Sequence, residues 1–325
     1  MLSSRQLACF CSLMASSVWL HQSATAQEAV PTRIASDERV LFFPQAAALA
    51  ADGSSWNVPI HGWIFEPESS DLLRSRILAG VRADLGFVVD QPSLARFDKR
   101  IRYFLVDNER DKRIGIRLCG RRFTMPESSE DGHFQRTLKI DRRLAEKHSK
   151  DGWLTFDVPL PADNQRSFRG RIRLRTAAGV TVISDVDDTV KISDVTDKKR
   201  LIANTFFKEF QAADGMAELY RTWKKMGADL TFVSASPWQL YPALSSWMDA
   251  EKFPQATFHL RQIRFRDSSL ARLFDDPFAS KVSRISAILK RFPRQTFILV
   301  GDSGEKDPEV TVSSQGDFRS RLWRL

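Results

Sequence analysis

The sequence predicts an α/β protein in which a parallel sheet follows a β-rich N-terminal region. Before about residue 175, short runs of β-branched and aromatic residues alternate with turn-forming residues, as in antiparallel strands. After that point, apolar strands alternate with helical patterns, and each strand ends in polar residues instead of a hairpin turn. Alternation of this kind indicates a parallel sheet with helices on its faces.

The first 26 residues have the features of a secretory signal. Arg5 gives a positive start, residues 7–20 are apolar, and residues 24–26 offer small side chains to a signal peptidase. We therefore expect an exported protein, periplasmic or extracellular, although a retained membrane anchor is the alternative. No apolar stretch of about 18 residues follows, so the mature chain should have no transmembrane segment.

The length of 325 residues favours two domains in the mature protein, each able to bury its own core. We expect the signal peptide at 1–26, a β-rich N-terminal domain at 27–178 and a catalytic domain at 179–325. Cys119 is the one cysteine left after cleavage, so no internal disulfide is possible, and we expect an inert, half-buried thiol.

The positive charge of the chain favours anionic partners. The formal net charge of +9 falls by one to +8 when Arg5 leaves with the signal peptide. Phosphate substrates and acidic membrane surfaces are partners of the right sign. The sequence contains no recognised nucleic-acid-binding module, so nucleic acid is not the expected partner.

The N-terminal half predicts an antiparallel β domain with one or two helices. Apolar spacing predicts a helix over 70–85, and turns are expected at 107–110 and 130–132. Strands are expected at 40–43, 58–65, 101–106, 114–118, 133–140, 153–158 and 168–174.

The C-terminal half predicts three central strands at 180–184, 230–233 and 297–300, with a further strand near 258–260. Helical patterns cover 206–226 and 281–292. Parallel sheets bind ligands at the carboxyl ends of their strands, so the polar residues that follow each strand are the candidate site.

Carboxylates and hydroxyls follow these strands. Asp185 and Asp187 follow the first strand and would project to one side if its extended geometry continued. Ser234 and Ser236 end the second strand and offer hydroxyls to phosphate oxygens. Residues 301–307 follow the third, with carboxylates suited to a hard cation.

These groups meet the needs of phosphate monoester hydrolysis. Asp185 is the candidate nucleophile, which would form an aspartyl phosphate. Asp187 would protonate the leaving alkoxide and later deprotonate water. Mg²⁺ and Lys281, at the start of the last helix, would neutralise the phosphate. Thr189, Lys191 and Ser236 complete the predicted site as substrate-binding residues.

The four elements resemble, in order, the motifs of haloacid-dehalogenase-like phosphatases: residues 185–189, a serine after the second strand, Lys281, and 301–307. Residues 185–193, 234–242 and 301–309 resemble more narrowly the phosphatidate phosphatase catalytic-domain family first named for a fungal actin-patch protein. The resemblance is strong over about 180–309. It implies a Rossmannoid parallel sheet without a large cap.

The resemblance also implies a set of roles. Asp185 would be the nucleophile and Asp187 the acid/base, with Ser234 and Lys281 on the phosphate. Asp185 would also be at the metal, and Asp187 would contact the metal through its backbone carbonyl. Asp302 would be a metal ligand and Asp307 an outer-shell ligand of Mg²⁺. After residue 309 the sequence departs from the family pattern, and its last sixteen residues should form only a short helix or strand.

Three hypotheses on function stay open. The first is a Mg²⁺-dependent phosphatase of phosphatidate or a related lipid phosphate. The second keeps the mechanism but assigns soluble phosphoesters or phosphoproteins as substrates. The third is a catalytically silent phosphate-binding surface protein. Trp238 and Tyr241 follow the second motif, where packing under the sheet competes with contact to a membrane interface.

Overall fold

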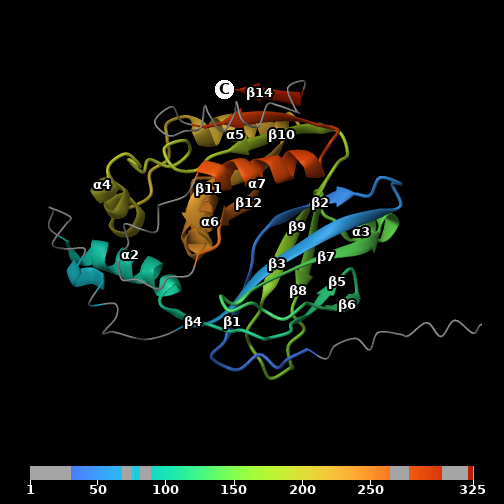
Figure 1. Cartoon of the computed structure of the whole chain (residues 1–325), viewed down its shortest axis with the longest axis horizontal. Helices are drawn as coiled ribbons and strands as arrows, with labels where there is room; N and C mark the ends of the chain where they lie inside the picture. The colour runs from blue at the N-terminus through green and yellow to red at the C-terminus, as the bar shows by residue number, and fades with distance from the viewer. Residues whose placement is uncertain are drawn as a thin grey trace, which may run out of the picture.

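The chain contains two β-sheets, one in each half of the sequence (Figure 1). The computed structural model describes residues 31–67, 75, 77–80, 89–263, 278–301 and 321–324. The expected signal peptide at 1–26 lies outside these residues. No helix in the described ranges is both long and apolar enough to cross a bilayer.

The N-terminal sheet has nine strands in the described residues, in the order β1-β3-β2-β9-β8-β5-β6, with β4 and β7 also paired to β3. The strands are β1 (Arg39–Phe42), β2 (Gln45–Leu49), β3 (Ser55–Pro67), β4 (Val106–Asn108), β5 (Gly115–Leu118), β6 (Arg121–Thr124), β7 (His133–Asp141), β8 (Trp153–Asp157) and β9 (Arg169–Arg175).

The strand pairings described for the N-terminal sheet are antiparallel, as predicted, with one exception: β2 pairs parallel with β9. Both β1 and β2 pair antiparallel with β3, one after the other, with Pro44 between them. The free edge of β2 then meets β9 in the same direction. Alternation of apolar and polar residues marks a strand but does not report the direction of its partner, so this pairing could not be predicted.

The predicted strand at 101–106 is wrong. Helix α2 (Gln91–Ile101) and a 3₁₀ turn, η1 (Arg102–Phe104), occupy most of this segment, and β4 begins only at Val106. Asp90 caps the helix by accepting a hydrogen bond from the backbone N–H of Ser93 at 2.9 Å. Phe97 and Ile101, four residues apart, are fully buried on one helix face. Of the helix predicted over 70–85, residues 75 and 77–80 are described and are helical.

The C-terminal sheet has five parallel strands in the described residues, in the order β12-β11-β10-β13-β14. This confirms an α/β protein with a parallel sheet after a β-rich region. The strands are β10 (Gly179–Ser184), β11 (Asp229–Pro237), β12 (Thr257–Arg261), β13 (Gln295–Val300) and β14 (Leu322–Arg324). Most of the last sixteen residues, for which only a short helix or strand was expected, lie outside the described residues.

Helices cover both faces of this sheet. The hydrophobic clusters place α7 with Ile183 and Val233, and place α5 and α6 with Val182 and Phe232 on the opposite face. The described helices are α3 (Arg142–His148), α4 (Lys198–Ile202), the π-helix η2 (Ala203–Phe207), α5 (Met216–Lys225), the 3₁₀ turn η3 (Trp238–Leu240), α6 (Tyr241–Ala250) and α7 (Phe278–Arg291).

The continuous helix predicted at 206–226 is broken in two. Phe206 and Phe207 end the π-helix, and α5 begins only after Gly215, which has φ +75°. A left-handed backbone at that position interrupts the α-helix, and glycine adopts it without a Cβ clash. Buried apolar side chains lie on both sides of the break, Phe206 and Phe207 before it and Tyr220 after it, so the spacing resembled one amphipathic helix.

The two sheets share buried contacts. The rings of Phe43 and Trp238 lie 4.1 Å apart between centroids. Across the same junction, the Gln45 side-chain amide donates to the Phe258 carbonyl at 3.0 Å. Arg175 donates through Nη2 to Thr231 Oγ1 at 2.7 Å. Trp238 is 4% exposed and Tyr241 7%. Their packing interpretation is therefore confirmed, and the N-terminal sheet directly supports the end of β11.

Two buried histidines in the N-terminal sheet should make stability pH-dependent. His61 Nε2 and His133 Nδ1 lie 3.0 Å apart. Burial lowers the pKa of His133 to about 4, against a smaller opposing attraction to Asp131. The unfolded state therefore takes up a proton below about pH 6.5 that the folded state refuses until about pH 4. We predict that the free energy of unfolding falls by up to about 3 kcal/mol over that interval.

Urea unfolding measured from pH 7.5 to 4.5 tests this prediction. As the pH falls, the free energy of unfolding of His133→Gln should decrease less steeply than that of the wild type. His148→Gln, at an exposed position on α3, should behave as the wild type does. If the free energy of unfolding depends on pH in the same way in all three proteins, the pH dependence does not come from His133.

Candidate active site

A tight loop follows β10 and carries the acidic residues. The backbone N–H of Asp185 donates to the Val300 carbonyl at 2.9 Å, which fixes Asp185 between the ends of β10 and β13. Asp188 has φ +54°, and its N–H donates to the Lys191 carbonyl at 2.7 Å. The chain therefore turns back on itself directly after Asp187.

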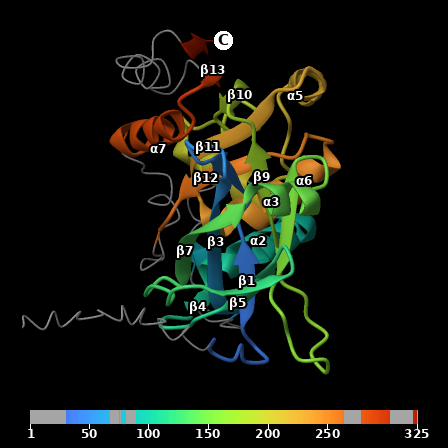
Figure 2. The same ribbon diagram turned by 90° about the vertical axis from the view of Figure 1, so that its right-hand side faces the viewer.

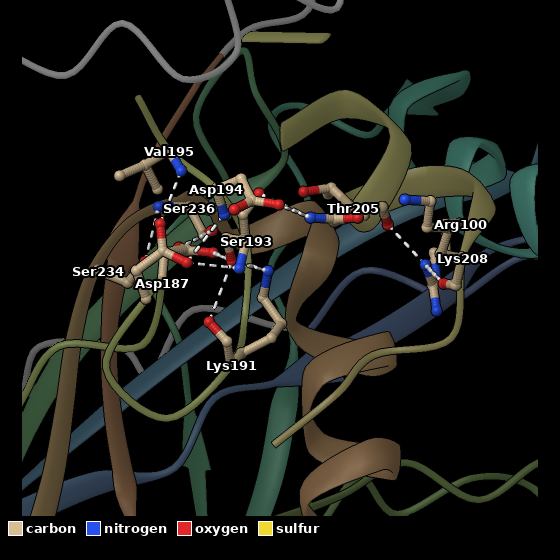
Figure 3. A network of polar contacts seen from close by, with 12 residues as sticks. Arg100, Asp187, Lys191, Ser193, Asp194, Val195, Thr205, Lys208, Ser234 and Ser236 are labelled. Atoms are coloured by element: carbon tan, nitrogen blue, oxygen red, sulfur yellow. Dashed lines mark hydrogen bonds and ion pairs between the residues drawn. The ribbon is translucent and has the colours of Figure 1, made fainter. Parts of the chain in front are cut away.

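Asp187 is the most heavily contacted carboxylate of the site (Figure 3). Its Oδ1 accepts from Ser193 Oγ at 2.7 Å and lies 2.8 Å from Lys191 Nζ. Its Oδ2 accepts from Ser234 Oγ at 3.0 Å and from Ser236 Oγ at 2.8 Å. Lys191 Nζ also donates to Ser193 Oγ. Both oxygens are thus engaged, one by the loop and the other by the end of β11.

The ionisation of Asp187 is set by two opposing effects. Burial by itself would raise the pKa, because a charged carboxylate loses its hydration. The Lys191 ammonium and the hydrogen bonds from Lys191, Ser193 and Ser236 outweigh burial and lower the pKa to about 2. Asp187 is therefore a carboxylate at neutral pH in this arrangement.

Asp185 lies beside the lysine predicted from sequence. Lys281 Nζ is 3.3 Å from Asp185 Oδ1, and both side chains are buried. Lys281 lies near the N-terminal end of helix α7, at the carboxyl edge of the sheet. Lys290 lies in the last turn of the same helix and is exposed. The ammonium is thus positioned to neutralise a group that approaches Asp185.

Asp188 holds the loop closed. Its carboxylate accepts from three successive backbone N–H groups, those of Ser193 at 2.6 Å, Asp194 at 2.8 Å and Val195 at 2.6 Å. A short acidic side chain suits both these hydrogen bonds and a left-handed backbone. The sequence assigned Asp188 no chemical role, and this geometry gives it the task of shaping the loop.

Arg100 supports the site from the N-terminal half, and sequence reasoning missed it. Its Nη1 donates to the carbonyls of Thr205 and Lys208 at 2.7 and 2.8 Å (Figure 3). Its guanidinium carbon lies 3.7 Å from the centre of the Phe210 ring, and Lys191 Nζ lies 5.1 Å from the same centre. One ring therefore contacts both cations. No local pattern around Arg100 could have indicated these distant partners.

The three predicted substrate-binding residues lie in different surroundings. Ser236 and Lys191 contact Asp187, as described above. Thr189 is buried, and in the described part of the structure its Oγ1 has no hydrogen-bond partner. A buried hydroxyl without a partner costs free energy, so the Thr189 side chain is suited to contact a bound ligand.

Asp185 and Asp187 could contribute to a site for a divalent cation. The carboxylate of Asp185 and the backbone carbonyl of Asp187 are oxygen donors of the kind that Mg²⁺ prefers. Both carboxylate oxygens of Asp187 are engaged by Lys191 and the three serines. The other predicted ligands, Asp302 and Asp307, lie outside the described residues. Within the residues that are described, no cluster of three or more acidic, histidine or cysteine side chains has the spacing of a metal site.

The C-terminal half of the chain is similar to known proteins. Residues 180–321 match the family model for the catalytic domain of phosphatidate phosphatase APP1. The chain is 33% identical over 148 residues to phosphatidate phosphatase APP1 of Saccharomyces cerevisiae, which is 44% of this chain and 25% of that protein. It is 26% identical over 161 residues to an uncharacterised protein of Schizosaccharomyces pombe, covering 48% and 26% respectively. The matched segments thus span about a quarter of each relative.

The buried pair of Asp187 and Lys191 predicts a large stability effect. Lys191→Met removes the cation and leaves a buried carboxylate, which should lower the free energy of unfolding by about 3–5 kcal/mol. Adding Asp187→Asn to that variant should recover part of the loss, because the uncompensated charge is then gone. Urea unfolding of both variants measures the coupling.

The matched control for this experiment is Lys225→Met at the exposed end of α5, where loss of the charge should change stability by less than about 0.5 kcal/mol. A Lys191→Met protein as stable as this control would show that the ion pair contributes nothing.

Proposed function

We propose that this chain is a Mg²⁺-dependent phosphatase that hydrolyses phosphate monoesters through an aspartyl phosphate. The match of residues 180–321 to the catalytic domain of phosphatidate phosphatase APP1 supports this proposal. The observation that carries the proposal is the pairing of Asp185 with the Lys281 ammonium at 3.3 Å. It lies at the same sheet edge where Asp187 meets Ser234 and Ser236.

In the first half of the reaction, an Asp185 carboxylate oxygen attacks phosphorus. A new oxygen–phosphorus bond forms and the bond to the leaving alkoxide breaks. Lys281 neutralises negative charge as this oxygen approaches the anionic phosphate, and buried charges are weakly screened. A bound Mg²⁺ would supply further neutralisation and orientation. The hydroxyl of Thr189 is a candidate donor to a phosphate oxygen.

Asp187 is the proposed acid and base. Its pKa of about 2 keeps it ionised but makes it a weak base, and protonation of an alkoxide requires the carboxylic acid. A phosphate dianion bound nearby would raise this pKa through like-charge repulsion, and Asp187 could then take a proton from solvent. It would pass this proton to the leaving oxygen and later remove one from the water that attacks the aspartyl phosphate.

We propose that the C-terminal sheet is a haloacid-dehalogenase-like Rossmannoid domain without a large cap, covering 179–325, after an N-terminal domain at 27–178. The described chain between β10 and β11 forms the loop, α4, η2 and α5, which supports the absence of a large insert there. Export through a signal peptide at 1–26 completes the proposal. Its support is the sequence pattern of those residues.

The proposed substrate is phosphatidate or a related lipid phosphate. The name of the yeast relative supports this, and so does the surface beside the loop. Ile192, next to Lys191, is 43% exposed, and the basic residues Lys199 and Arg200 of α4 are exposed as well. An exposed apolar side chain, followed within eight positions of the sequence by exposed cations, suits an anionic membrane surface.

The proposal predicts that residues 27–325 release phosphate from phosphatidate vesicles only when Mg²⁺ is present. Asp185→Asn should lower the rate by at least about 10³-fold, because the amide is a poor nucleophile. Asp163→Asn, at an exposed loop position, should retain the wild-type rate. Released phosphate is measured for vesicles, a small chromogenic phosphoester, soluble phosphoesters and a phosphoprotein.

Each outcome of this panel bears on a separate part of the proposal. Hydrolysis of soluble phosphoesters without hydrolysis of vesicles would reject the lipid substrate and keep the mechanism. Equal rates for wild type and Asp185→Asn would reject the mechanism. Ligand binding that depends on Mg²⁺, without any turnover, would identify a silent phosphate-binding protein.

A further inference from the structure

The π-helix η2 lies between the N-terminal half and the loop that follows β10. All five of its residues, Ala203–Phe207, are buried. The backbone N–H of Lys208 donates to the carbonyl of Ala203 at 3.0 Å, which is the five-residue spacing of a π-helix. Turns of this kind are rare and occur frequently at functional sites, so the contacts of η2 bear on the function of the loop.

Helix α2 of the N-terminal half holds one side of η2. Figure 1 and the perpendicular view of Figure 2 both show α2 just below α6, and Phe97 of α2 shares a hydrophobic cluster with Phe206 and Phe207. The rings of Phe97 and Phe207 are stacked, with their centroids 4.9 Å apart. Arg100 donates to the Thr205 carbonyl at 2.7 Å (Figure 3). The N-terminal half therefore fixes η2 through its backbone and its aromatic side chains.

Asn204 connects η2 to the loop that carries Asp187. Its Nδ2 donates to the Ser193 carbonyl at 3.1 Å and to Asp194 Oδ2 at 3.0 Å. Asn204 is 8% exposed and Ser193 is fully buried, so water competes little for these hydrogen bonds. Asp194 has φ +58°, a left-handed conformation that persists only with support from its surroundings. The Asn204 amide supplies such support to both loop residues.

Ser193 lies between Asn204 and the proposed acid and base. Its Oγ donates to Asp187 Oδ1 at 2.7 Å, and its backbone N–H donates to Asp188 Oδ1 at 2.6 Å. The carbonyl, the N–H and the hydroxyl of Ser193 thus each have a defined partner. A hydroxyl on a backbone that is held on both sides can fix the direction of the carboxylate that accepts from it.

We propose that Asn204 is a positioning residue that acts on Asp187 through Ser193, an inference that rests on the proposed role of Asp187 as acid and base. Asn204 holds the Ser193 carbonyl, and the Ser193 hydroxyl then directs the Asp187 carboxylate toward the leaving oxygen. Proton transfer requires hydrogen-bond distance between the acid and the leaving oxygen. A displaced Asp187 therefore slows the departure of an alkoxide more than the departure of a stable anion such as nitrophenolate.

The values of kcat/KM for two phosphoesters, measured with residues 27–325 and Mg²⁺, test this role. Dioctanoyl phosphatidate has an alkoxide leaving group that needs a proton, and p-nitrophenyl phosphate has a leaving group that does not. Asn204→Ala should lower kcat/KM by at least about 10-fold for dioctanoyl phosphatidate and by less than about 3-fold for p-nitrophenyl phosphate. The later hydrolysis of the aspartyl phosphate does not contribute, because kcat/KM reports the steps up to departure of the leaving group.

The matched control is Thr205→Val, at the next position of the same π-helix. Thr205 is 1% exposed, and in the described part of the chain its Oγ1 has no hydrogen-bond partner. Valine keeps the branched shape, so both kcat/KM values should stay within about 2-fold of the wild type. If Asn204→Ala does not fold, Asn204→Ser gives the same comparison. An equal decrease for the two esters would show a general loss of folded structure and overturn the positioning role.

A double-mutant cycle in thermal unfolding gives a readout that does not depend on turnover. If Asn204 acts on Asp187, Asn204→Ala should lower the melting temperature less in an Asp187→Asn background than in the wild type. Thr205→Val should have the same effect in both backgrounds. Equal decreases for Asn204→Ala in the two backgrounds would contradict the coupling. If the wild type hydrolyses neither ester, the proposed function fails, and this cycle still decides whether Asn204 supports Asp187.

Discussion

The buried carboxylate of Asp187 is the constraint on which the candidate site depends. It joins the loop after β10 to the end of β11 through Lys191, Ser193, Ser234 and Ser236. A charge in this position is tolerated only because it is paired and hydrogen-bonded on both oxygens. The position of each of these four side chains therefore depends on the others.

Contacts around this carboxylate extend into the N-terminal half. Lys191 lies over Phe210, and Arg100 of α2 covers the same ring and holds two carbonyls of the adjacent chain. At the other side of the site, Phe43 packs on Trp238 just after β11. The N-terminal region is thus part of the support of the loop and of the serines, in addition to forming its own core.

The sequence predicted the structure best where a buried apolar strand is followed directly by polar residues. A strand buried on both faces has a continuous apolar run, so residues 180–184 could be recognised, and the polar residues after it marked the carboxyl edge. Lys281 could be placed because a helix before a parallel strand starts at that edge. The structure brings Lys281 to Asp185, and Ser234 and Ser236 to Asp187, although the catalytic roles of all these residues remain proposals.

Other features depend on contacts that a local pattern does not contain. Ile101, Phe104 and Leu105 are buried in the core that includes residues of both halves, and the composition of residues 101–106 therefore resembles a strand. The break at Gly215 separates the buried Phe206 and Phe207 from α5, which buries Tyr220, and the spacing of the two segments resembled one helix. Arg100 has its partners more than a hundred positions away. Lys191 was predicted to bind substrate, and only the folded loop reveals its contact with Asp187.

Mass spectrometry of the acid-quenched protein tests the central claim most directly. During turnover of a phosphoester with Mg²⁺, a peptide that contains Asp185 should carry the mass of one phosphoryl group, bound as a hydroxylamine-sensitive acyl phosphate. The same peptide from Asp185→Asn should not carry it. Turnover without any such adduct on a rapid time course, or an adduct on another residue, would contradict Asp185 as the nucleophile.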